Sequence, residues 1–153
     1  MKQTPHDRKI MERMAPGVLS RDGFLGNDTR SLDEIIATDR AGLRALGVNE
    51  RDLADKMEAV FEKARGQLGR PIDINEKLKA VYRESMGRIP SPWPGEGVFQ
   101  KGEVEVTDKE SGESLRFTPL SIHLIREHGF FQGRGSSFRL EPDVLCRCLR
   151  LVG

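Results

Sequence analysis

The sequence has little of several features that define common classes of protein. Cysteine occurs twice, as Cys146 and Cys148, which is too few and too closely spaced for the disulfide framework of a small secreted protein. Two positions apart on a helix, they point to nearly opposite sides, so we expect free thiols. No apolar run is long enough to span a bilayer, and Met1 to Ile10 lacks the apolar core of a signal peptide. These absences predict a cytoplasmic protein without membrane contact.

An excess of one charge is also absent. The chain has 25 Lys and Arg against 24 Asp and Glu, a formal net charge of +1, so no overall field draws it to nucleic acid. Leu46 to Asn49 resembles the turn of a helix-turn-helix, but the following helix carries several acidic side chains that would repel phosphates: Glu50, Asp52, Asp55, Glu58 and Glu62. We therefore expect no nucleic-acid partner.

The remaining composition is that of a globular protein on the hydrophilic side. Hydrophobic residues make up 37%, charged residues 32% and aromatic residues 6% of the chain. A chain of 153 residues can bury a sizeable core without a disulfide or a structural metal, so we expect no cofactor. One domain over residues 1–153 is the interpretation, with a helical part to about 87, a proline-rich connector at 88–97 and a last part at 98–153.

The helical part is best marked between Ser31 and Gly69. Ser31 and Asn49 have the positions of N-caps before two amphipathic stretches, and a shorter helix is predicted from His6 to Met14. Residues 71–87 are ambiguous, because Ile72 and Ile74 alternate as in a strand while the apolar residues from Leu78 onward also fit a helix. A strand followed by a helix is the interpretation of this stretch.

The second half begins with three prolines between Pro90 and Gly97, which favour a connector because proline lacks an amide donor. Trp93 within it is expected to plug the core. The pattern then predicts a β-hairpin from strands at 98–107 and 114–117, and a helix at 119–128 with Thr118 and Gly129 at its ends. A last helix is predicted at 142–151, with an apolar face that includes Val152. The predicted fold class is α+β: a helical N-terminal half, then a β-hairpin followed by two short helices.

The helix at 119–128 contains the first candidate for chemistry. His123 and Glu127 lie one helical turn apart and can form an acid-base or metal-binding pair, with His128 just beyond. His123 and His128 are separated by roughly 140° around the helix, which argues against a shared ion. No metal site is assigned, and an ordinary structural pair of His123 with Glu127 stays open.

The segment 126–139 contains the second candidate. Its glycines can form a concave nest of backbone amides, while arginines and hydroxyls offer donors to an anion: Arg126, Arg134, Ser136, Ser137 and Arg139. The competing interpretation is a tight loop whose phenylalanines fill the core.

Three hypotheses about function follow. The first is a non-enzymatic binding or regulatory protein that recognises an anionic small molecule or a protein partner through residues 126–139. The second is a small hydrolase or lyase that uses His123 and Glu127. The third is a structural module that forms a homodimer.

Overall fold

The computed structural model describes residues 4–151 and begins with three helices. They are α1 (Pro5–Arg13), α2 (Leu32–Ala45) and α3 (Glu50–Arg65). At each start a polar side chain accepts a hydrogen bond from a backbone amide of the first turn: Thr4, Ser31 and Asn49. The helical N-terminal half and the two caps at Ser31 and Asn49 are therefore confirmed.

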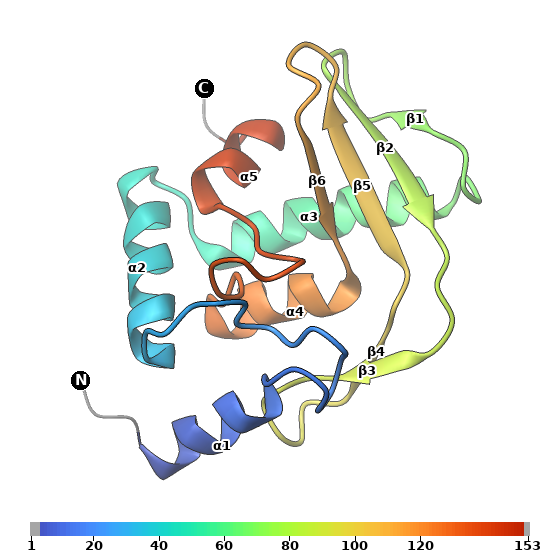
Figure 1. The fold of residues 1–153 in the computed structure, drawn as a ribbon. Helices are drawn as coiled ribbons and strands as arrows, with labels where there is room; N and C mark the ends of the chain where they lie inside the picture. Colours follow the sequence, from blue (N-terminus) through green and yellow to red (C-terminus); the bar gives the residue numbers. More distant parts are fainter. Residues whose placement is uncertain (1–3, 152–153) are drawn as a thin grey trace.

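Two antiparallel sheets follow the helices, as Figure 1 shows. The larger sheet has the order β1-β2-β5-β6, from strands β1 (Ile72–Asp73), β2 (Leu78–Arg83), β5 (Glu103–Asp108) and β6 (Ser114–Phe117). The smaller sheet pairs β3 (Arg88–Pro90) with β4 (Val98–Gln100). Helices α4 (Pro119–His128) and α5 (Pro142–Cys148) complete the chain, so the predicted α+β class is confirmed.

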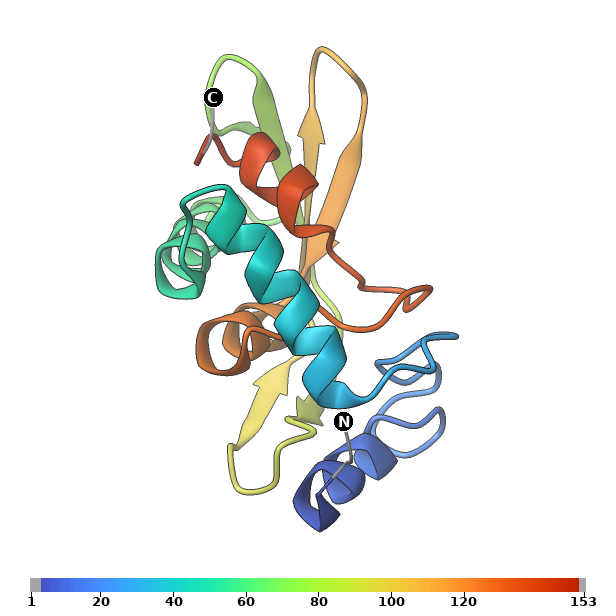
Figure 2. The same ribbon diagram turned by 90° about the vertical axis from the view of Figure 1, so that its left-hand side faces the viewer.

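The larger sheet packs its inner face against the helices, which lie on one side of it (Figure 2). Alternate residues of its central strands are buried: Leu78, Ala80 and Tyr82 of β2, and Val104 and Val106 of β5. Such alternation is typical of an antiparallel sheet with one face in water. Helix α3 covers this face with a stripe of buried residues: Leu53, Met57, Val60, Phe61 and Ala64.

Helix α4 is held between this core and a second apolar cluster. Ile122 and Ile125 belong to the first core, whereas Leu120 and Leu124 pack in the second. The second cluster combines α1, the loop after it, the loop between β3 and β4 and the segment after α4: Ile10, Met14, Phe24, Trp93 and Phe130. Because opposite sides of α4 are buried, the histidine at 123 lies on a strip between them.

The sequence interpretation of residues 71–87 is wrong in its second half, because no helix forms there. Leu78 and Tyr82 are four residues apart, a spacing that suits both a helix and a strand of period two. In the structure they lie on the same buried face of β2, and Met86 is 93% exposed rather than part of an apolar stripe. The sheet is consequently larger than the predicted hairpin.

Three boundaries also differ from prediction. The connector at 88–97 contains β3 and the loop of a small hairpin. A proline is tolerated in this strand, because Pro90 lies at the end of a two-stranded sheet where its missing amide is not needed. The predicted strand 98–107 is interrupted at Gly102, where an added Cβ would lie 2.2 Å from the Tyr82 hydroxyl oxygen. The last helix ends at Cys148, and Val152 lies outside the described residues.

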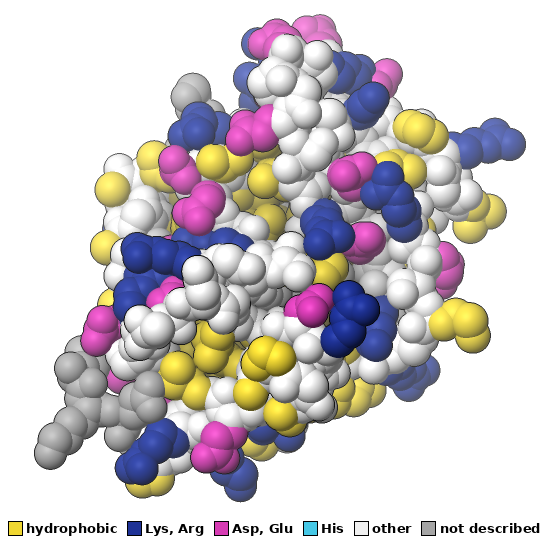
Figure 3. Space-filling model, viewed as in Figure 1, with side chains coloured by type: hydrophobic (Ala, Val, Ile, Leu, Met, Phe, Trp, Pro, Cys, Tyr) yellow, Lys and Arg dark blue, Asp and Glu magenta, His cyan; other side chains and the backbone are white. Residues whose placement is uncertain are grey.

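The surface of the described part carries mixed charge. In Figure 3, basic and acidic side chains alternate over the face viewed in Figure 1. Within residues 4–151, none of the helices has both the length and the apolar character that crossing a membrane requires. Both cysteines are buried and unbridged, as the sequence predicts.

Candidate functional site

Helix α4 is fixed at both ends by local sequence signals. Thr118 and Ser121 exchange hydrogen bonds between side chains and backbone in a capping box, and Pro119 occupies the first turn. At the other end Gly129 adopts φ +63, and the amide of Phe130 donates to the carbonyl of Leu124. This left-handed cap ends the helix at His128, so its imidazole lies at the helix C-terminus.

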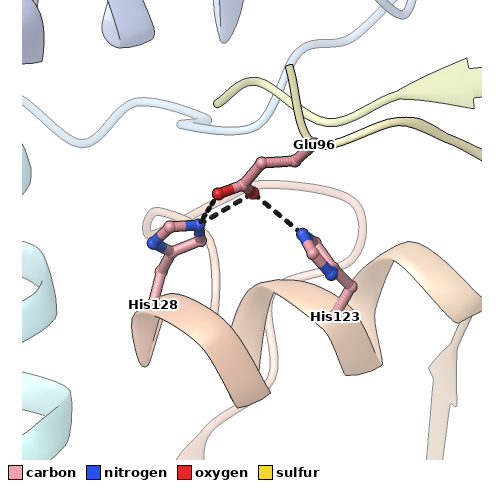
Figure 4. Close-up of side chains that lie close together, drawn as sticks. All are labelled: Glu96, His123 and His128. Atoms are coloured by element: carbon pink, nitrogen blue, oxygen red, sulfur yellow. Dashed lines mark hydrogen bonds and ion pairs between the residues drawn. The ribbon is translucent and has the colours of Figure 1, made fainter. Parts of the chain in front are cut away.

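The loop between β3 and β4 brings a carboxylate to this helix. The amide of Ser91 donates to the carbonyl of Gly97 at 3.1 Å, which closes the loop. Gly95 and Gly97 have φ of +82 and +92, conformations that allow the chain to turn on either side of Glu96. Glu96 therefore projects from the loop toward α4, as Figure 4 shows.

Helix α1 holds this loop in place. The guanidinium of Arg13 donates to the carbonyl oxygens of Ser91 and Pro92, both at 2.8 Å. The buried Ser91 hydroxyl accepts from the amide of Trp93 and donates to Oε1 of Glu96 at 3.3 Å. Ser91 thus orients the carboxylate from within the loop, and Arg13, far away in the sequence, fixes the loop itself.

Glu96, His123 and His128 form one cluster. Nε2 of His123 lies 2.9 Å from Oε1 of Glu96, and Nε2 of His128 lies 2.8 Å from each carboxylate oxygen (Figure 4). An ionised carboxylate only accepts hydrogen bonds, so both imidazoles donate through Nε2–H in this arrangement. The exposed side-chain fractions are 27% for Glu96, 20% for His123 and 19% for His128, so solvent reaches the cluster.

Aromatic rings surround the two imidazoles. The Trp93 ring stacks on His128 with centroids 3.9 Å apart and an interplanar angle of 7°. Phe99 lies 4.7 Å from His123, and Phe130 packs on the edge of Trp93. Trp93 is 9% exposed, as expected of a core plug, but it also fixes the plane of a histidine.

The electrostatics of Glu96 follow from this environment. Burial alone raises the pKa of Glu96, but the hydrogen bonds from His123 and His128 lower it by more. The net pKa therefore lies below the ordinary value, and the carboxylate is ionised near neutral pH.

The structure changes the sequence interpretation of the histidines. The angle of roughly 140° separates their Cβ atoms, yet each Nε2 lies several bonds beyond Cβ, and the rings converge on a carboxylate from another element. Glu127 is exposed, and within residues 4–151 His123 forms its hydrogen bond with Glu96 and none with Glu127. Glu96 was missed because its partners lie 27 and 32 positions away; the glycines beside it were the available signal.

The backbone of the glycine-rich segment after α4 contacts the loop before α2. The amide of Gly133 donates to the carbonyl of Phe24 at 2.9 Å, and that of Arg134 donates to the carboxylate of Asp28 at 3.1 Å. A Cβ on Gly133 would lie 2.3 Å from the carbonyl oxygen of Leu25. These glycines permit two backbones to touch, and the amides are used within the protein.

Most of the predicted anion-binding side chains have internal partners. Arg139 pairs with Asp39 of α2 and with Glu141, while Arg126 pairs with Asp55 and Glu58 of α3.

The remaining residues of the segment are divided between surface and core. Ser136 donates to the side chain of Gln132, whereas Arg134 and Ser137 are exposed. Phe130 and Phe131 are each 1% exposed, which agrees with the core interpretation of the segment.

Comparison with protein-family models, with curated proteins and with solved structures finds no match to this chain. The chemistry of the cluster therefore rests on its own geometry.

Proposed function

We propose that the protein binds a divalent transition-metal ion, with zinc as the reference case, through Glu96, His123 and His128. The observation that carries the proposal is that one donor atom from each residue lies within 4.8 Å of the other two. Two imidazoles and one carboxylate form a ligand set that proteins use for zinc and for non-haem iron.

The distances fit an ion with a small adjustment. Tetrahedral zinc bonds of about 2.0–2.1 Å place neighbouring ligand atoms about 3.3 Å apart. The carboxylate now lies 2.8 to 2.9 Å from the two Nε2 atoms, so a retreat of Glu96 by a fraction of an ångström opens the position.

Binding of a metal ion requires that both imidazoles lose the proton on Nε2. Each Nε2 must present a lone pair, so the proton that it now donates to Glu96 moves to Nδ1 or to solvent. Affinity for the metal therefore falls as the pH decreases through the range where imidazoles become protonated.

Three protein ligands leave at least one coordination position for water or a small molecule. Catalytic zinc sites have this property, whereas structural sites are closed by four protein ligands. A bound ion would supply a Lewis acid at this position. The partial exposure of all three side chains provides the route from solvent.

Titration with Zn²⁺ tests the proposal, because the chain carries its own reporter. Trp93 is the single tryptophan and stacks on His128, so its fluorescence reports on this imidazole. We expect saturable binding of one ion per chain with a change in tryptophan emission, measured together by calorimetry and fluorescence. The affinity should fall at least about 100-fold in Glu96→Gln and in His123→Gln.

His6→Gln is the matched control, because it removes the third histidine of the chain from an exposed position on α1. It should bind Zn²⁺ like the wild type. Equal binding by the wild type and both cluster variants would refute the proposal.

A further inference from the structure

A cavity lies apart from the cluster of Glu96, His123 and His128 and shares none of its residues. It is a cavity of about 270 Å³ between the loop after α1, β3, β5 and the segment after α4. Its walls include four apolar side chains: Phe24, Ile89, Leu120 and Phe138. The volume is slightly below the usual range of about 300–1,000 Å³ for drug-sized ligands, which suits a small metabolite.

Glu103 gives this cavity an unsatisfied acceptor. Its Oε2 is buried and has no hydrogen-bond partner within the described residues, and the guanidinium of Arg116 lies 3.8 Å away. A buried acceptor without a donor is destabilising, because it has lost its hydrogen bonds to water. The side chain lines the cavity and is 21% exposed, so the carboxylate, which forms an ion pair with Arg116, has capacity to accept a hydrogen bond from a ligand as well.

Lys101 supplies the opposite charge two residues earlier. Its side chain is exposed and also lines the cavity. A molecule that lies against both side chains meets a carboxylate and an ammonium group.

The backbone conformation of Gln132, which lines the cavity, also supports a binding site there. It is 7% exposed and has φ +70, a left-handed conformation that residues other than glycine rarely adopt. Its carbonyl accepts from Arg139, and its side chain accepts from Ser136. Conformations of this kind, maintained by several hydrogen bonds, are concentrated at binding sites.

We propose that this cavity binds an α-amino acid with an apolar side chain, in its zwitterionic form. The ligand's ammonium group donates to Glu103, and its carboxylate accepts from Lys101. Its apolar side chain packs among Phe24, Ile89 and Leu120. Arg21 and Asp22 also line the cavity but pair with each other at 3.5 Å, so the two charges of the ligand are assigned to Glu103 and Lys101, and the apolar lining is covered.

Calorimetric titration with L-phenylalanine tests this site in protein kept metal-free by a chelator, so that the outcome is separate from the metal proposal. We expect saturable binding with a dissociation constant in the millimolar range or tighter. Phenethylamine lacks the carboxylate and 3-phenylpropionate lacks the ammonium group. Each should bind about tenfold more weakly.

Two variants locate the binding. Glu103→Gln and Lys101→Gln should each weaken L-phenylalanine about tenfold, and the exposed position of Lys101 keeps the test valid if the Glu103 variant does not fold. Glu105→Gln, on the same strand, is the control and should bind like the wild type.

Three results would overturn the proposal. They are the absence of saturable binding at millimolar concentration, truncated probes that bind as tightly as L-phenylalanine, and unchanged affinity in Lys101→Gln.

Discussion

Two neighbouring regions of the chain contain the residue types from which binding sites are made, and the fold uses them differently. In the Glu96–His123–His128 cluster, one carboxylate faces two partly exposed imidazoles, and their donor atoms converge. In the glycine-rich segment 129–139, backbone amides and Arg139 are used by Phe24, Asp28 and Asp39. A candidate site is therefore distinguished by the polar groups that remain accessible to a ligand once the hydrogen bonds and ion pairs within the fold have formed.

The largest expected effect tests the structural role of the second region. Arg139→Ala leaves the carboxylate of Asp39, which is 5% exposed, without its partner. Removal of one member of a buried ion pair costs about 3–5 kcal/mol, so the free energy of unfolding in urea should fall by that amount. The control is Arg147→Ala, whose ion pair with Asp143 is exposed on both sides and should contribute at most about 1 kcal/mol. Equal losses in both variants would contradict the structural role of Arg139.

A smaller effect concerns the close approach of two backbones. Gly133→Ala places a methyl group 2.3 Å from the carbonyl oxygen of Leu25, which cannot retreat without moving the loop. We expect a loss of about 1–3 kcal/mol in thermal or urea unfolding. Gly42→Ala is the matched control of opposite sign, because it lies in open space within α2 and should stabilise the protein by about 1 kcal/mol. A neutral Gly133→Ala would show that the glycines do not serve this contact.

The acid dependence of stability sharpens the account of the first region. The pKa of Glu96 is lowered in the folded protein, so its stabilisation is present above its ordinary value of 4.5 and is lost as the pH falls through the lower folded pKa. In the presence of a chelator, the wild type should exceed Glu96→Gln by about 1–2 kcal/mol near neutral pH. This difference should decline below 4.5. Glu127→Gln, which changes an exposed carboxylate of α4, is the matched control.

The smallest effect is expected at Arg134, whose side chain is exposed in the glycine-rich segment. Arg134→Ala should change the free energy of unfolding by less than about 0.5 kcal/mol. It should also leave Zn²⁺ binding unchanged, as measured by calorimetry. A large loss of metal affinity would show that the two regions form one site, and the comparison drawn above would fail.

Local signals in the sequence account for much of the fold. The caps at Ser31, Asn49 and Thr118 and the left-handed turn at Gly129 were predictable, because each acts within one turn of a helix. The strand at Leu78–Arg83 was interpreted as a helix, because the four-residue spacing of Leu78 and Tyr82 fits two periods. Which period prevails depends on pairing with β5, and that partner lies far along the chain.

The candidate site was predictable only in part. His123 and His128 stand out by residue type, although their spacing argued against a shared ion. Glu96 enters the cluster through the chain reversal between β3 and β4, a loop that Arg13 holds in place. The pairing of Arg139 with Asp39 likewise joins residues 100 positions apart. Contacts of this range depend on tertiary packing and leave no periodic pattern in the sequence.

The most direct test of the central claim is the position of an ion in a crystal. Anomalous scattering at the zinc absorption edge, from crystals grown with Zn²⁺, locates the metal without assumptions about the ligands. The account predicts one strong peak about 2.0–2.2 Å from a carboxylate oxygen of Glu96 and from Nε2 of both His123 and His128. A peak elsewhere, with Glu96 still hydrogen-bonded to both imidazoles, would contradict it.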